Sequence, residues 1–78
     1  MLVDDLIELG LSENEAKIYI SLLELGPSTT GPLIKKSGLY RFIVYDTLYK
    51  LLKLGLVNYS IKRNRKQFEA ENPKQILE

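Results

Sequence analysis

An apolar stripe between two glycines constrains this chain more than any other feature. Between Gly38 and Gly55, the residues Val44, Leu48 and Leu51 recur at the i, i+4, i+7 spacing of an amphipathic helix. Each glycine can adopt the left-handed conformation that ends a helix. The pattern therefore predicts a helix of about 14 residues with one face against a core. The opposite face, which is basic and aromatic, is left for a partner.

A capping box marks the start of another helix. The Ser12 hydroxyl can accept a hydrogen bond from the Glu15 amide, and the Glu15 carboxylate can accept one from the Ser12 amide. The helix that starts there is expected to run through Leu25, and it is apolar over much of its circumference. Such a helix is buried on more than one side.

Two shorter helices complete the helical part. Apolar residues within 2–10 predict a short first helix. A threonine before Pro32 can cap a second short helix, which ends at Gly38. The few residues between this helix and the next one include a glycine, a spacing that is typical of a helix-turn-helix.

The apolar period changes to two residues after the last of these helices. Val57, Tyr59 and Ile61 alternate with polar residues and predict a half-buried strand. Residues 63–66 predict a polar turn, and residues 67–71 predict a return strand. The helices and this hairpin together predict an α+β, mostly helical fold: a winged helix-turn-helix with three to four helices plus a β-hairpin wing.

The length of the chain bounds the number of domains. Because it has only 78 residues, we expect one winged helix-turn-helix domain over residues 1–72. An asparagine followed by Pro73 is typical of a helix start, so residues 73–78 are expected to begin a C-terminal helix or linker.

The composition excludes several kinds of chemistry. The chain has no His and no Cys, so it lacks the commonest general base and the usual ligands of a transition metal. It also has no Gly-rich phosphate loop. We therefore expect no enzymatic activity, no cofactor and no metal. No apolar run is long enough to span a membrane, so a cytoplasmic protein without a membrane partner is expected.

The charges are distributed unevenly along the chain. Residues 1–26 carry a net charge of −5, residues 27–68 carry +8, and residues 69–78 carry −2, which leaves +1 overall. A chain with this distribution has a basic face in spite of its nearly neutral total. A polyanion is therefore a candidate partner.

Two segments of the chain share a pattern with a known family. The first consists of Leu9-Gly10-Leu11-Ser12, Glu15-Ala16-Lys17-Ile18-Tyr19, Leu22-Leu23 and Gly26. The second consists of Val44-Tyr45-Asp46-Thr47-Leu48, Leu51 and Gly55-Leu56-Val57. Together they resemble the opening, the recognition helix and the entry to the wing in the TrmB-type archaeal transcriptional regulators. The resemblance covers nearly the whole chain.

The resemblance implies a winged helix-turn-helix DNA-binding domain that is commonly a homodimer. Long members of the family join this domain through a helix to an effector-binding domain. That second domain is not in this sequence, so we expect either a compact standalone member or a fragment, with no effector identified. Members tend to have a proline and further polar or basic residues at the start of the recognition helix. Here Tyr40, Phe42 and Ile43 stand there, and Arg41 is the only charged side chain.

Residues on the predicted recognition helix are the first candidates for a DNA interface. Arg41, at its start, is placed to meet base edges, where arginine to guanine is the commonest specific contact. Phe42 and Ile43 could touch thymine methyl groups, or they could form an apolar patch for a protein partner. The remaining candidates, of which the lysines would contact phosphate, are Tyr49, Lys50 and Lys53.

The predicted hairpin tip carries the strongest candidate cluster. Four bases at one turn repel each other and favour a polyanion, as a wing on the DNA backbone or in the minor groove would provide. They are Lys62, Arg63, Arg65 and Lys66. Further possible phosphate contacts on or before the short helix are Thr30, Lys35 and Lys36.

A dimer seam is predicted from the apolar residues of two helices, which are more numerous than a single core-facing stripe requires. They are Ile18, Leu22, Leu25, Leu52 and Leu54. The alternative for these residues is a larger core within one chain.

The sequence thus predicts a double-stranded DNA-binding domain of a transcriptional regulator. Its recognition helix would lie in the major groove, and its basic wing would lie on the backbone or in the minor groove. The alternative is a winged-helix protein–protein interaction module in a larger complex, such as the transcription machinery. It would dock through an apolar patch formed by Tyr40, Phe42, Ile43 and Tyr49.

Overall fold

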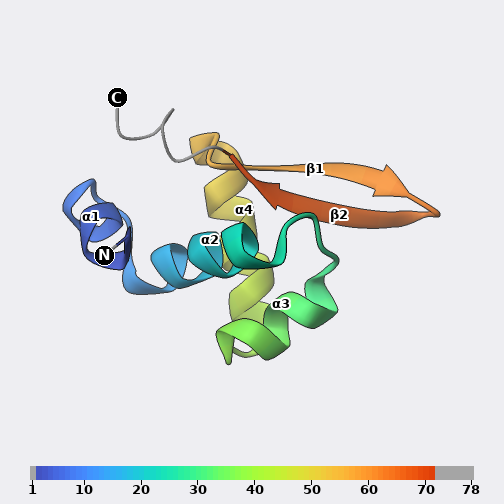
Figure 1. Cartoon of the computed structure of the whole chain (residues 1–78), viewed down its shortest axis with the longest axis horizontal. Helices are drawn as coiled ribbons and strands as arrows, with labels where there is room; N and C mark the ends of the chain where they lie inside the picture. The colour runs from blue at the N-terminus through green and yellow to red at the C-terminus, as the bar shows by residue number, and fades with distance from the viewer. Residues whose placement is uncertain (1, 72–78) are drawn as a thin grey trace.

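The computed structural model describes residues 2–71 of the chain, and within them four helices are followed by a β-hairpin (Figure 1). The elements are α1 (Leu2–Glu8), α2 (Glu13–Leu25), α3 (Thr30–Ser37), α4 (Arg41–Leu54), β1 (Val57–Lys62) and β2 (Arg65–Ala70). This architecture confirms the predicted winged helix-turn-helix. The helix or linker expected from Pro73 onward lies outside the described residues.

Local sequence signals set the ends of the helices. The Glu15 amide donates to the Ser12 hydroxyl at 3.2 Å, and the Ser12 amide donates to the Glu15 carboxylate at 2.7 Å, so the predicted capping box is present. Gly38 and Gly55 adopt the left-handed conformation with φ of 72° and 77°, and they end α3 and α4. The predicted bounds of α4 are therefore confirmed.

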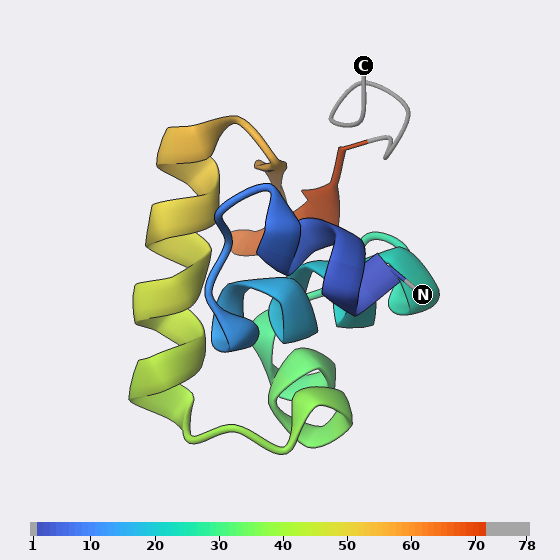
Figure 2. The same ribbon diagram turned by 90° about the vertical axis from the view of Figure 1, so that its left-hand side faces the viewer.

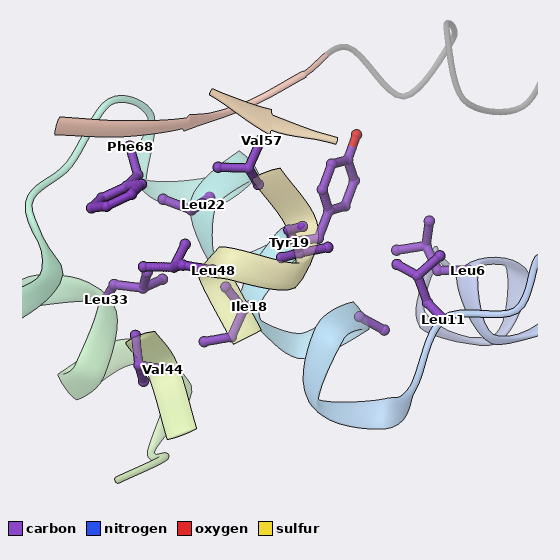
Figure 3. Packing of buried hydrophobic residues seen from close by; sticks show 12 residues of the cluster. Leu6, Leu11, Ile18, Tyr19, Leu22, Leu33, Val44, Leu48, Val57 and Phe68 are labelled. Atoms are coloured by element: carbon purple, nitrogen blue, oxygen red, sulfur yellow. The ribbon is translucent and has the colours of Figure 1, made fainter. Parts of the chain in front are cut away.

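The core forms where α2 meets α4, α3 and the base of the hairpin (Figure 3). Side chains from all four helices, both strands and the loop between α1 and α2 fill it. They are Leu6, Leu11, Ala16, Ile18, Tyr19, Leu22, Leu33, Val44, Leu48, Leu51, Val57 and Phe68.

Burial of α2 corrects part of the predicted dimer seam. Ile18 and Leu22 are fully buried within one chain, so they cannot contact a second one, and the prediction was wrong for both. The larger intrachain core, which was the alternative, accounts for them. Leu52 is half-buried against the same core. Leu25 and Leu54 remain exposed, and for these two the seam stays a prediction.

Tyr19 ties α2 to the end of the hairpin. Its ring is fully buried, and its hydroxyl donates to the backbone carbonyl oxygen of Glu71 at 2.5 Å. Burial of the phenol, together with the negative charge of Glu71, raises the pKa of Tyr19 above its ordinary value of 10.0. The hydroxyl therefore stays protonated as a hydrogen-bond donor across the physiological pH range.

The turn of the hairpin is tighter than the sequence suggests. Lys62 pairs with Arg65, so only Arg63 and Asn64 form the loop, and both have positive φ, of 53° and 63°. Two left-handed residues in succession match a type I′ turn, whose twist suits an antiparallel pair. The predicted four-residue turn over 63–66 was therefore wrong, because Arg65 and Lys66 belong to β2.

The hairpin is anchored at its base and projects away from the helices (Figure 1). Ser28, between α2 and α3, exchanges two backbone hydrogen bonds with Phe68, at 2.9 and 2.7 Å. On β1 only Val57 is buried, while Tyr59 and Ile61 are exposed. The prediction of a half-buried strand is thus correct at the base and wrong toward the tip, where no helix lies beneath the strand.

Candidate nucleic-acid interface

A groove of about 660 Å³ runs between the start of α3, one side of α4 and the hairpin. It is the place where three segments far apart in the sequence meet. Its lining residues are Thr29, Thr30, Gly31, Pro32, Tyr45, Leu48, Tyr49, Leu52, Tyr59, Arg65, Lys66 and Phe68. Leu48, Leu52 and Phe68 contribute apolar surface to it, and the other lining residues include hydroxyl groups and cations.

Hydrogen bonding and ring packing fix the aromatic side chains of this groove. The hydroxyl groups of Thr30 and Tyr45 lie 3.1 Å apart and are hydrogen-bonded, which joins α3 to α4. The Lys66 ammonium group lies 4.8 Å from the centre of the Tyr59 ring, a cation–π arrangement. The Tyr59 ring in turn packs against Phe68, with ring centroids 5.9 Å apart. A cation is therefore held beside the groove rather than free in solvent.

The outward face of α4 forms a ridge next to the groove. Phe42, Asp46, Tyr49 and Lys53 follow the spacing of one helical face, and all four are exposed. Figure 2 shows α4 along one edge of the molecule, with no other described element on its outer side. The ridge is therefore free to enter a groove of a partner.

Electrostatic pairing leaves few charges of the ridge available. The Lys50 ammonium nitrogen lies 3.3 Å from an Asp46 carboxylate oxygen, so these two charges compensate each other. At the start of α4, the rings of Tyr40 and Phe42 are nearly parallel, with centroids 6.3 Å apart and planes 9° apart. The aromatic side chains expected there thus form one exposed stack.

The wing carries cations on both of its faces. The strand register places Lys66 on the face that holds Tyr59 and Phe68, and it pairs Lys62 with Arg65 on the other face. Arg65, next to the turn, also lines the groove. Within residues 2–71, none of the wing cations forms an ion pair. Like charges directly across a strand pair are destabilising. A bound anion would offset this repulsion.

The predicted phosphate contacts on α3 separate into two groups. Thr30 lies in the groove at the start of the helix. Lys35 and Lys36 lie in the last turn, outside the groove, and Lys36 is 3.6 Å from Glu24 of α2. The structure therefore brings Thr30, Tyr49, Arg65 and Lys66 together and leaves the two lysines apart from them.

Two tyrosines of the groove were not among the predicted site residues. Tyr45 lies beside the core stripe of α4, and Tyr59 belongs to the alternating pattern that predicts a half-buried strand. A second stripe in the sequence could have revealed Tyr45, because Tyr45, Tyr49 and Leu52 repeat the i, i+4, i+7 spacing beside the core positions. Tyr59 has no comparable signal, since its exposure depends on how far the hairpin projects.

Metal and membrane chemistry can be assessed for the described residues. Residues 2–71 contain no cluster of three or more side chains able to hold a metal ion. In the same part of the chain, none of the helices has both the length and the apolar character that crossing a membrane requires.

The helical core, the helix-turn-helix of α3 and α4, and the hairpin beside it define a winged helix-turn-helix domain. Residues 6–74 match the family described as sugar-specific transcriptional regulator TrmB. The chain belongs to this family, which confirms the resemblance read from its sequence.

A curated relative supports the family assignment. The HTH-type sugar sensing transcriptional regulator TrmBL1 of Pyrococcus furiosus is 31% identical over 77 residues, which are 99% of this chain and 22% of the relative. The chain thus spans less than a quarter of the length of that relative.

Two solved structures share the fold. One is Bordetella bronchiseptica BpsR, whose DNA binding is regulated by 6-hydroxynicotinic acid; its TM-score is 0.78 at 15% identity, over 86% of this chain and 50% of that chain. The other is Sso10a-2, a DNA-binding protein from Sulfolobus solfataricus; its TM-score is 0.64 at 21% identity, over 78% of this chain and 66% of that chain. At these identities the likeness concerns the fold alone.

Proposed function

We propose that this domain binds double-stranded DNA as part of a transcriptional regulator. The ridge of α4 enters the major groove, and the wing lies on the backbone or in the minor groove. The observation that carries the proposal is the position of the unpaired wing cations beside a groove whose other side is α4. Membership of a family of transcriptional regulators and the two DNA-binding neighbours of the same fold support it.

The contacts follow from the chemistry of each surface. Arg65 and Lys66, with the hydroxyl groups of Thr30 and Tyr45, line a concave path that suits a sugar-phosphate backbone. Arg41, at the first position of α4, is placed for base edges in the major groove. Lys62 and Arg63 extend the cationic surface to the tip of the wing. No catalytic role is assigned to any residue.

The salt dependence of binding tests the proposal. If each protomer neutralises about five phosphates, the log–log slope of affinity against salt is about −4 to −5 per protomer. Replacing both Arg63 and Arg65 by Ala should flatten that slope by roughly one to two units and weaken all sequences alike. The matched control is Lys17→Ala, which removes a cation of α2 that pairs with Glu13, and it should leave the slope unchanged.

A titration of labelled duplex at low and moderate salt measures these slopes. Absence of affinity even at low salt would contradict the proposal and favour a protein-interaction module instead. Arg41→Ala provides a second readout, because loss of a base contact should reduce the preference for a selected sequence over random DNA.

A further inference from the structure

The ridge of α4 presents two aromatic side chains where a duplex reader usually presents hydrogen-bonding groups. Phe42 is 72% exposed and Tyr49 is 67% exposed. They lie seven residues apart on one face, which corresponds to about 10 Å along the helix. At a base-pair rise of about 3.4 Å, this separation equals about three base-pair steps.

Hydrogen-bonding capacity on the same ridge is limited. Asp46, which lies between the two aromatic residues, is paired with Lys50. Within α4 the remaining cations are Arg41 at the first turn and Lys53 at the last turn. The middle of the ridge therefore offers base edges two aromatic rings and one exposed charge pair whose opposite charges compensate each other.

Stacking holds the first aromatic side chain in place. Tyr40 is 75% exposed, and its ring lies nearly parallel to that of Phe42. Because the two rings support each other, Phe42 loses less conformational freedom when it meets a partner. A pre-arranged apolar contact is the result.

We propose that α4 reads thymine through its C5-methyl group, with Phe42 and Tyr49 as the specificity-determining residues. That methyl is the apolar group that unmodified base pairs present in the major groove. Cations flank the aromatic surface and favour a polyanion over an apolar protein partner. They are Arg41 and Lys53 on α4 and Arg65 and Lys66 on the wing. The inference rests on the proposed function and adds the base chemistry that is recognised.

Removal of the methyl alone tests the inference. A mixed-sequence duplex of 24 base pairs is synthesised twice, once with thymidine and once with deoxyuridine throughout, so charge and base pairing stay the same. Burial of a methyl-sized group corresponds to about fourfold in affinity. The uracil duplex should therefore bind about 4- to 16-fold more weakly, according to whether one or both aromatic side chains meet a methyl.

Variants assign the difference to the ridge. Phe42→Ala should weaken binding to the thymine duplex, and the ratio of the two affinities should fall close to that expected from one remaining contact. The double variant, which adds Tyr49→Ala, should bind the two duplexes equally. Ile61→Ala, an exposed apolar residue of the wing, should leave the ratio unchanged. Lys53→Ala should weaken both duplexes equally.

The outcomes separate this inference from the proposed function. Equal affinity of the unmodified domain for the two duplexes would overturn the inference while leaving DNA binding intact. A difference that survives in the double variant would overturn the assignment to Phe42 and Tyr49. Absence of binding to either duplex at low salt would contradict both proposals.

Discussion

Arg63 occupies a backbone conformation that its side chain does not favour. Its φ of 53° lies in the left-handed region, which costs roughly 1 kcal/mol or more for an ordinary L-residue and less for Asn. The long cationic side chain is thus kept at the tip of the wing at some cost in stability. A contact between Arg63 and a partner would explain why this strained backbone conformation is kept at an exposed charged residue.

A single substitution should separate stability from binding at this position. We expect Arg63→Asn to raise the free energy of unfolding by about 0.5–1 kcal/mol, because Asn tolerates the left-handed conformation of a type I′ turn. The same change should lower DNA affinity and flatten the salt slope by about one unit. Thermal unfolding and duplex titration of the same preparation measure both effects, and a rise in both stability and affinity would contradict this role of Arg63.

Tyr19 should make stability depend on alkaline pH. Because burial raises its pKa in the folded state, the unfolded chain releases the phenolic proton first as the pH rises above about 10. The contribution of Tyr19 to stability is therefore complete below that pH and is lost as the pH rises through the folded pKa. Tyr19→Phe should remove this part of the alkaline decline, which denaturant unfolding at pH 8 to 11 measures.

The same variant has an effect at neutral pH. Loss of the hydrogen bond from the hydroxyl to the carbonyl of Glu71 should cost about 1 kcal/mol. An unchanged alkaline profile in Tyr19→Phe would contradict the assignment of the decline to Tyr19.

Among the elements, α2 determines whether the interface is presented at all. It contacts α1, α3, α4 and β2, so its stability supports each surface that would meet DNA. We expect Ser12→Ala, which removes the capping hydroxyl, to lower the free energy of unfolding by about 1 kcal/mol. At temperatures where the variant is folded, its DNA affinity should equal that of the unmodified domain. A loss of affinity in the folded variant would show that the start of α2 belongs to the interface.

The helices were predictable because their signals are local. The capping box at Ser12, the glycines at 38 and 55 and the stripe through Leu48 each act within a few residues of the chain. The burial of individual side chains was not predictable in the same way, because it depends on how elements that are distant in the sequence pack together. Ile18 is buried because α2 packs against α3 and α4 (Figure 3). Tyr59 is exposed because the wing extends past the helices.

At the scale of the whole molecule, self-association remains a proposal. The domain is small, and small domains bury a limited fraction of their surface. Leu25 and Leu54 keep exposed apolar side chains at the ends of α2 and α4. We expect a homodimer with twice the chain mass of 9.0 kDa in light scattering, and we expect Leu54→Glu to shift it toward the monomer. A single species of monomer mass at high concentration would rule the dimer out.

The central claim, that bound DNA lies on the side of the molecule that carries the wing and not at α1, can be measured by directed cleavage. Because the chain has no Cys, a single introduced cysteine can carry an iron chelate that cleaves nearby DNA. Two variants are made: Asn64→Cys at the wing tip and Glu8→Cys at the end of α1. Glu8 contributes neither to the groove nor to the ridge, which makes it the control. We predict cleavage of a bound duplex from position 64 at the backbone flanking the site and none from position 8. Cleavage from position 8, or none from position 64 at saturation, would contradict the account.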